Sequence, residues 1–223
     1  MKKMKRILTA GILFCLLMGT LAGCGGSAEE ETPVEYPAME LVDISGMELA
    51  TAENDTAKYQ YPADTWEPSE EVLNSLMVYE KGTMDTEEPV SVTVQVAGER
   101  KKQLSQDFME EVLKQLEKNA SLTVNTCELR SFNGEPMIYM ENSFTFNDEV
   151  IDQMIENKQW TEESIEKAGG REAILSIPDS NSIIVYSIVD GNLVVYGGAY
   201  YTEEQKQPVV DAINVMMQTT EVK

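Results

Sequence analysis

The pattern of apolar and polar positions predicts a β-sheet from about residue 76 onward. In its clearest strand four valines alternate with polar residues, which is typical of a strand with one apolar face: Val90, Val92, Val94 and Val96. Residues 76–79 are the predicted neighbour of this strand. Residues 182–189 are apolar at both odd and even positions, so we expect a central strand that is covered on both faces.

One helix and two hairpins follow from residue spacing and turn chemistry. Apolar residues at helical spacing predict a helix over about 104–118, with a buried stripe of Leu104, Phe108, Val112 and Leu116. The dipeptides Asn133-Gly134 and Asp190-Gly191 favour the positive φ angles of a type I′ turn. We therefore expect two antiparallel hairpins, which pair residues 122–132 with 136–146 and residues 182–189 with 193–200.

Shorter elements fill the rest of the chain. Two short helices are expected, one after Asn147 and one after Thr161, followed by a strand at about 172–177. Pro208 lies too deep for one continuous last helix, because proline lacks the backbone donor that a helix interior needs. We expect a short turn there, followed by a main helix with Pro208 near its first position.

The first residues carry the pattern of an export signal. Four basic residues among the first six precede an apolar run from Ile7 to Leu21, which as a helix is about 22 Å long and short of the ~30 Å bilayer core. The sequence Leu21-Ala22-Gly23-Cys24 resembles the lipobox of bacterial lipoproteins. The resemblance implies a signal peptide over 1–23, a diacylglyceryl group on Cys24, and a protein anchored to the cell membrane outside the cytoplasm. The alternative is an ordinary cleaved signal with a chance cysteine.

The segment from residue 24 to residue 57 is interpreted as an acidic tether. It contains nine acidic residues and no basic one, and glycine and proline interrupt it. Such a block of one charge sign is typical of a disordered, solvated linker. The alternative is an ordered segment from about residue 37, because apolar residues from Met39 to Leu49 could dock onto the domain.

Composition removes several classes of chemistry. The chain has no histidine, which excludes a Ser-His-Asp triad, a Cys-His dyad and an imidazole zinc site. Its formal charge of −22 argues against a nucleic-acid partner, since phosphate binding needs a surplus of Lys and Arg. No calcium-loop motif is present, so we expect neither a metal nor a cofactor. Cys127 is the only ordinary thiol of the mature chain and is interpreted as a small buried residue.

The elements together predict a single α+β domain over residues 58–223, with an antiparallel β-sheet of about five to seven strands and helices packed on it. Their order, from Tyr61-Pro62 and Trp66 to the ending Tyr200-Tyr201-Thr202 through Met217, resembles the PsbP-like fold. The resemblance implies an antiparallel sheet and a non-enzymatic role in partner binding.

One motif matches a catalytic pattern without its companions. Ser164-Ile165-Glu166-Lys167 fits the Ser-x-x-Lys motif of penicillin-recognising enzymes, but the Ser-Asp-Asn and Lys-Thr-Gly motifs are missing. We interpret the four residues as a solvated helix end. Carboxylate pairs could hydrolyse glycosides without histidine, but among 39 acidic residues no pair is singled out.

Aromatic residues form the candidate binding surface, because aromatic side chains are enriched at interfaces. They are Trp160, Tyr196, Tyr200 and Tyr201. The alternative is that they close an edge of the core. Gly197-Gly198 inside an apolar strand indicates close approach of a ligand or packing under a helix.

These features predict a lipid-anchored extracytoplasmic protein, with a non-catalytic domain that binds an unidentified protein or small molecule. Two alternatives stay open at this point. One is a carboxylate-dependent hydrolase of the cell envelope, and the other is a small solute-binding lipoprotein of a transporter.

Overall fold

The computed structural model describes residues 35–68 and 76–223. The lipobox, Cys24 and the first part of the acidic segment, to residue 34, lie outside these residues, so the predicted signal peptide and lipid anchor are not described structurally. Within the described residues, no helix is both long enough and apolar enough to cross a membrane.

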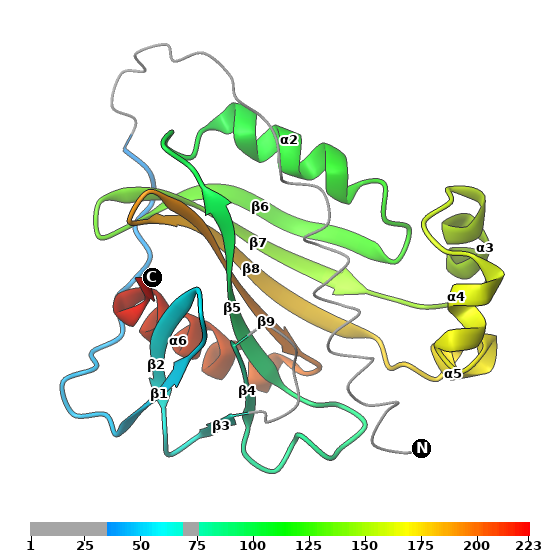
Figure 1. Ribbon diagram of the computed structural model, residues 1–223, viewed down its shortest axis with the longest axis horizontal. Coiled ribbons are helices and arrows are strands. Elements are labelled where there is room, and N and C mark those ends of the chain that lie inside the picture. The colour runs from blue at the N-terminus through cyan, green and yellow to red at the C-terminus, as the bar shows by residue number, and fades with distance from the viewer. Residues whose placement is uncertain (1–34, 69–75) are drawn as a thin grey trace.

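The centre of the molecule is an antiparallel sheet of seven strands (Figure 1), which confirms the predicted fold class. The strands follow the spatial order β3-β4-β5-β9-β8-β7-β6. Their bounds are β3 Trp66–Pro68, β4 Leu76–Glu80, β5 Ser91–Glu99, β6 Leu122–Phe132, β7 Glu135–Phe144, β8 Ser180–Val189 and β9 Asn192–Tyr200.

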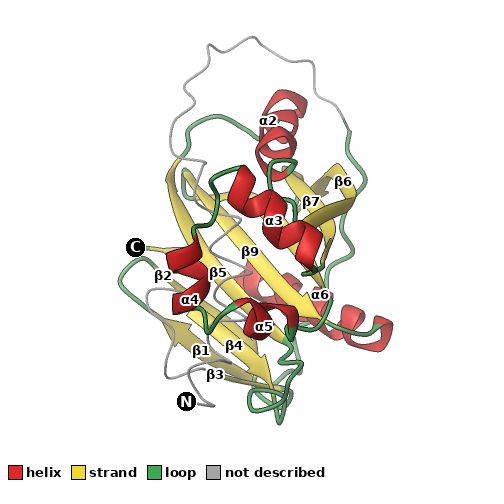
Figure 2. Cartoon of the chain, turned by 90° about the vertical axis from the view of Figure 1, so that its right-hand side faces the viewer, coloured by secondary structure: helices red, strands yellow, loops and turns green. Residues whose placement is uncertain are grey.

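A second, three-stranded sheet of order β1-β2-β10 joins the two ends of the described chain. Its strands are β1 Leu49–Glu53, β2 Ala57–Pro62 and β10 Glu221–Val222. The helices are α2 Gln106–Leu116, α3 Asp148–Glu156, α4 Glu162–Lys167, α5 Arg171–Leu175 and α6 Glu203–Thr219. α6 and α2 cover opposite faces of the large sheet, and α3, α4 and α5 gather beyond one end of its strands (Figure 1 and Figure 2).

Both predicted hairpins are confirmed, and they form the pairs β6–β7 and β8–β9. Asn133 and Gly134 have φ angles of 51° and 86°, and Asp190 and Gly191 have 50° and 75°. Positive values at both central residues define a type I′ turn, whose twist matches that of the flanking strands. The predicted pairing of 76–79 with the valine strand is confirmed as β4–β5.

The predicted strand at 172–177 is wrong, because residues 171–175 form the short helix α5. Gly170, with a φ of 89°, separates α5 from the preceding helix. The Arg171 side chain then donates to Asp148 on α3 at 2.6 Å and to Asp152 at 2.7 Å. These contacts join residues far apart in sequence, so local periodicity could not reveal them.

The predicted break before Pro208 is also wrong, because α6 runs without interruption from Glu203 to Thr219. The Gln205 side chain caps the helix start by accepting hydrogen bonds from the backbone of Tyr201 and Thr202, at 2.9 and 3.0 Å. Proline leaves only the carbonyl of Glu204 without its helical donor. Glu204 is exposed, so water can satisfy that carbonyl and the helix continues.

Residues 37–57 are ordered and packed on the domain, which is the alternative considered for the tether. Ser131 of β6 donates its backbone N–H to Pro37 and accepts one from Met39. Met39 is buried, and the backbone of Val42 donates to the side chain of Asn214 on α6 at 3.1 Å. The folded domain therefore begins about twenty residues before the predicted boundary at 58, because its core needs this segment as a cover.

The large sheet separates two hydrophobic clusters. On β8, Ile183 and Val185 belong to the cluster under α6, and Ile184 and Tyr186 belong to the cluster under α2. This confirms that residues 182–189 form a central strand covered on both faces. Gly198 lies under α6, where a Cβ atom would overlap the side chain of Val209, so the packing interpretation of this glycine is confirmed.

Candidate functional site

The sheet face opposite α6 carries a group of small polar side chains that lie side by side across four strands. Residues that pair with one another from strand to strand form a line across the sheet, which we call a register line. In one register line Ser91 of β5 pairs with Ala199 of β9. Ala199 also pairs with Ser182 of β8, and Ser182 pairs with Asn142 of β7. Adjacent positions on the same face add Thr93 on β5 and Ser180 on β8. We call these five residues the polar row: Ser91, Thr93, Asn142, Ser180 and Ser182.

The polar row is enclosed, and several of its atoms have no hydrogen-bond partner. Its side chains are between 1% and 5% exposed. The Asn142 amide donates to Ser182 Oγ at 3.3 Å. Thr93 Oγ1, Asn142 Oδ1 and Ser180 Oγ make no hydrogen bond in the described structure. A buried polar atom left unpaired costs about 1–3 kcal/mol, so such a cluster calls for an explanation.

Two features of the sequence produce this face: side chains alternate between the two faces along each strand, and the residues of β9 beside the polar row are small. The second register line runs from Thr93 through Gly197 to Ile184 and Met140. The valines of β5 point into the cluster under α6, so the residues between them must point to the opposite face. Gly197 and Ala199 contribute almost no side chain there, which leaves the hydroxyl groups on either side uncovered by their neighbours on the sheet.

One tyrosine borders the polar row, and a second lies farther along the same face, beyond Ile184. Tyr79 of β4 pairs with Ser91, and burial raises the pKa of its hydroxyl. Tyr186 lies on the same face, packs edge to face against Phe108 of α2 with ring centroids 6.5 Å apart, and has a hydroxyl with no hydrogen-bond partner among the described residues. Burial also raises the pKa of Tyr186. Both tyrosines are therefore neutral at physiological pH and can donate as well as accept.

The polar row and these two tyrosines contain no charged side chain. The nearest ionisable group in the second register line is Cys127 of β6, which pairs with Met140. Burial, with a smaller effect of Glu128, raises the pKa of the Cys127 thiol to about 11. Cys127 is half-buried and packs against the cluster under α2, so it is a neutral thiol and a poor nucleophile.

A second polar cluster lies on the opposite face, and its carboxylate is partnered. Glu141 of β7 accepts a hydrogen bond from Lys206 of α6 at 2.8 Å and one from the hydroxyl of Tyr139 at 2.9 Å. The Arg130 guanidinium stacks on the Tyr139 ring at 3.8 Å. Burial alone would raise the pKa of Glu141, but the two hydrogen bonds outweigh it and lower the pKa. This cluster fastens α6 to β7 and leaves the carboxylate ionised.

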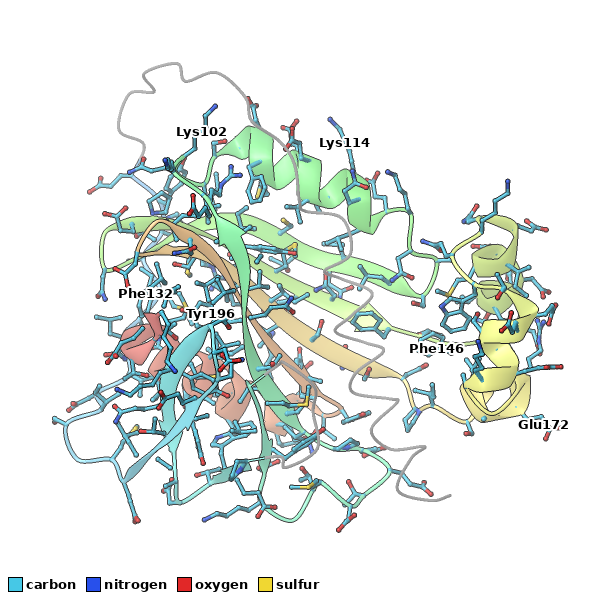
Figure 3. All side chains as sticks on the ribbon, in the orientation of Figure 1. Lys102, Lys114, Phe132, Phe146, Glu172 and Tyr196 are labelled. Carbon is cyan, nitrogen blue, oxygen red and sulfur yellow. The ribbon has the colours of Figure 1, made fainter. Side chains whose placement is uncertain are left out.

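The four aromatic residues predicted as a binding surface do not form one. Tyr196 is fully buried under α6 and Tyr200 is also buried. Trp160 stacks on Phe146 beside α3, with ring centroids 5.9 Å apart. Figure 3 shows Phe146 and Tyr196 in different parts of the molecule. The alternative interpretation, that these aromatic residues close edges of the core, describes Trp160, Tyr196 and Tyr200.

Tyr201 is the one member of that set with a connection to the polar row. It is half-buried, and burial, followed by the charges of Glu88 and Tyr79, raises its pKa to about 12. Since Tyr79 is paired with Ser91, Tyr201 lies near the β4 end of the polar row.

The Ser-x-x-Lys residues serve the structure of α4. Ser164 Oγ donates to the Thr161 carbonyl at 2.7 Å and accepts from the Thr161 backbone at 2.9 Å, which caps the helix. Lys167 forms an ion pair with Glu163 at 2.7 Å. Both side chains are therefore engaged as expected for a helix end. In the described part of the chain no group of three or more carboxylates or cysteines could hold a metal ion.

The polar row itself was missed by the sequence analysis. The signal was present in the residues between the valines of β5, but a polar residue opposite an apolar face is usually a solvent-facing one. Nothing in the local pattern distinguishes a polar residue in water from a polar residue enclosed by the rest of the fold.

The sequence matches no protein-family model and no curated protein. Solved structures that are similar in fold include the three described next. Cyanobacterial PsbP (CyanoP) from Synechocystis shares 13% identity over 92% of this chain and 100% of its own, with a TM-score of 0.40. Mycobacterium tuberculosis LpqN, described as involved in cell envelope biogenesis, shares 10% over 79% of this chain and 91% of its own, with a TM-score of 0.41.

The third is the Ran-binding protein Mog1p of Saccharomyces cerevisiae, with 9% identity over 79% of this chain and 96% of its own, and a TM-score of 0.44. The similarity concerns the arrangement of helices and strands alone.

Proposed function

We propose that this chain is a lipid-anchored extracytoplasmic protein whose domain binds an uncharged ligand at the polar row without transforming it. The observation that carries the binding site is the set of enclosed polar atoms without partners, Thr93 Oγ1, Asn142 Oδ1 and Ser180 Oγ, on one sheet face. The anchor rests on the lipobox resemblance at Cys24.

The energetics favour a ligand as the missing partner. An unpaired buried hydroxyl or amide oxygen destabilises the folded chain, and a ligand that supplies the hydrogen bond removes this penalty on binding. Asn142 and Ser180 lie on the neighbouring strands β7 and β8, whereas Thr93 lies on β5, on the far side of β9. A single ligand would therefore have to extend across β9 to satisfy all three atoms. Ordered water is the competing partner, because water also occupies enclosed polar sites, and the experiment below separates the two.

The chemistry of the site indicates the class of ligand. The groups of the polar row are hydroxyls and one amide, and apolar atoms of Ile184 and Met140 lie beside them. A charged ligand would lose its hydration there without finding a counter-charge. A neutral molecule with several hydroxyl or amide groups, such as a sugar or an uncharged peptide, fits both the hydrogen-bonding groups and the apolar surface.

Binding rather than catalysis is supported by the state of the reactive groups described above. Glu141 is an ionised carboxylate held by two donors, which makes it a poor general acid. Cys127 is a neutral thiol, and Ser164 is occupied as a helix cap. The proposal therefore expects the purified protein to hydrolyse no glycan or peptidoglycan substrate, and turnover that survives repurification would contradict it.

The variant Thr93→Val tests the site, because it replaces an unpaired hydroxyl with a methyl group of similar size. We expect the free energy of unfolding to rise by about 1 kcal/mol in the absence of ligand. Thermal stabilisation by the neutral sugars or dipeptides that raise the Tm of the parent protein should at the same time be lost. If water is the only partner, no compound of the panel raises the parent Tm, and the binding proposal fails.

The anchor is tested separately. Cys24→Ala should release the protein from the membrane fraction of cells that export it, whereas Cys127→Ala, which changes the other cysteine of the predicted mature chain, should leave the protein in that fraction. Undiminished membrane retention of Cys24→Ala would contradict lipid anchoring.

A further inference from the structure

Positive charge is concentrated in one short stretch of this acidic protein. Outside the four basic residues of the predicted signal, the chain has 13 Lys and Arg residues, and five of them lie within residues 100–118. With four acidic residues in the same stretch, its net charge is +1, although the whole chain carries −22. The stretch includes the only run of three consecutive basic residues outside the signal, Arg100-Lys101-Lys102.

The fold holds this basic run in a fixed place. It follows β5, and the backbone of Arg100 donates to the carbonyl of Gly191, in the β8–β9 turn, at 2.7 Å. The Arg100 guanidinium stacks on the Phe108 ring of α2, 3.7 Å from its centroid. With Arg100 fastened on both sides, the exposed side chains of Lys101 and Lys102 project from a rigid base.

Two further exposed lysines lie at the C-terminal end of α2, Lys114 in its last turn and Lys118 just beyond it. The other charged residues of α2 are the acidic Asp107, Glu110 and Glu111. Figure 3 shows Lys102 and Lys114 at the same, upper end of the molecule. We call this surface, made of Lys101, Lys102, Lys114 and Lys118, the basic end.

The described chain also begins at the basic end. In Figures 1 and 2 the first described residues, from residue 35, lie at the upper end of the molecule, as does the connection from β5 to α2. Only ten residues separate Cys24 from residue 35. If Cys24 carries a lipid, the membrane lies within about 40 Å of this point, because each extended residue spans at most about 3.6 Å.

We propose that the basic end faces the membrane and contacts anionic lipid headgroups, so that the domain is held in one orientation. This inference rests on the lipid anchor of the proposed function. The remaining surface is acidic and is repelled by an anionic membrane, while lysines near such a surface are attracted within a Debye length. Four lysines would bind weakly on their own, but a tether keeps them at a high effective concentration next to the headgroups.

Lysine labelling on vesicles tests the orientation. The lipidated full-length mature protein is incorporated into neutral phosphatidylcholine vesicles and into vesicles with 30 mol% phosphatidylglycerol, and treated with an amine-acetylating reagent. We expect acetylation of Lys101 and Lys102 to be about fivefold slower on the anionic vesicles, and the difference to disappear at high salt. Lys167, which is 74% exposed on α4, is the internal control and should react equally on both.

A soluble-phosphate control and vesicle flotation separate failure of the orientation from failure of the lipid anchor. Soluble glycerol phosphate, at the concentration of the anionic lipid, should protect none of these lysines, and equal protection by it would overturn the lipid assignment. If the protein floats with both kinds of vesicle but Lys101 and Lys102 react equally on both, the orientation is wrong and the anchor stands. If the protein floats with neither, the anchor fails, and the proposed membrane contact fails with it.

Discussion

The polar side chains on the two faces of the large sheet differ in whether they have hydrogen-bond partners. Under α6, the carboxylate of Glu141 is satisfied by Lys206 and Tyr139, and aliphatic and aromatic side chains fill the remaining space. One buried hydroxyl of this face, that of Tyr196, has no hydrogen-bond partner among the described residues. On the other face, Thr93, Asn142 and Ser180 are more fully enclosed than Glu141 and present atoms without partners among the described residues. The first arrangement stabilises the fold, and the second carries a penalty that only an external molecule can remove. The difference locates the proposed binding site on the face opposite α6.

The largest expected effect is a loss of stability at Gly198, where the α6 face is most tightly packed. A Cβ atom at this position would overlap Val209 and crowd Ile213 and Val92. We expect Gly198→Val to lower the free energy of unfolding by about 3 kcal/mol, because overpacking forces neighbouring side chains and backbone to shift. Urea denaturation measures it, and a loss below 1 kcal/mol would show that α6 is not closely seated on the sheet.

A hydroxyl placed on the α6 face should be costly. Val92 is fully buried on that face, one residue from Thr93 on the other. We expect Val92→Thr to lower the free energy of unfolding by about 2 kcal/mol, the penalty of an unpaired buried hydroxyl together with lost apolar contact. Chemical denaturation of this variant beside Thr93→Val compares the two faces on one strand. If both variants changed the free energy of unfolding in the same direction, the proposed difference between the two faces would be wrong.

Removal of a hydroxyl from the polar row should not lower the free energy of unfolding, in contrast to the addition of one on the α6 face. Ser180→Ala deletes an Oγ atom that has no hydrogen-bond partner. We expect the free energy of unfolding to stay unchanged or to rise by up to about 1 kcal/mol, since no native hydrogen bond is lost. Calorimetry of the ligand-free protein measures the change. A clear loss of stability would mean that a tightly held water satisfies this atom, and would weaken the case for a ligand.

An effect of similar size concerns the pH dependence of stability on the α6 face. The pKa of Glu141 in the folded protein lies below its usual value of 4.5, so its contribution to stability is complete above that pH and is lost as the pH falls through the folded pKa. We expect Glu141→Gln to cost about 1 kcal/mol at pH 7 and less at pH 3. Thermal denaturation across this range measures it, and an unchanged slope would show that the Lys206 contact adds no stability.

Local chemistry explains which elements were predictable. Asn133-Gly134 and Asp190-Gly191 demand positive φ angles that few other dipeptides tolerate, so both hairpins follow from the chain alone. The apolar stripe from Phe108 to Leu116 likewise determines a helix. The elements that were missed depend on distant partners: α5 is held by contacts of Arg171 with α3, and the docked segment at Met39 by β6 and α6.

In the candidate site too, some features follow from local sequence and others depend on contacts between distant residues. Reasoning from residue types selected Tyr196 and Tyr200 for a binding surface, since aromatic side chains are common at interfaces. Whether an aromatic side chain lies at the surface or in the core depends on the element that packs over it, and α6 covers Tyr196. Thr93 was placed correctly on the polar side of its strand, but its enclosure depends on the rest of the fold.

The sequence by itself determined the two hairpins and the central strand, because each depends on residues within one short stretch, and the order of such elements determined the α+β class. The tertiary structure decided which polar residues are enclosed, where the N-terminal segment docks and which end of the molecule is basic. These properties arise when strands distant in sequence become neighbours, as Ser91, Ser182 and Asn142 do in the sheet. Enclosure and charge distribution are properties of that assembly, and no single segment carries them.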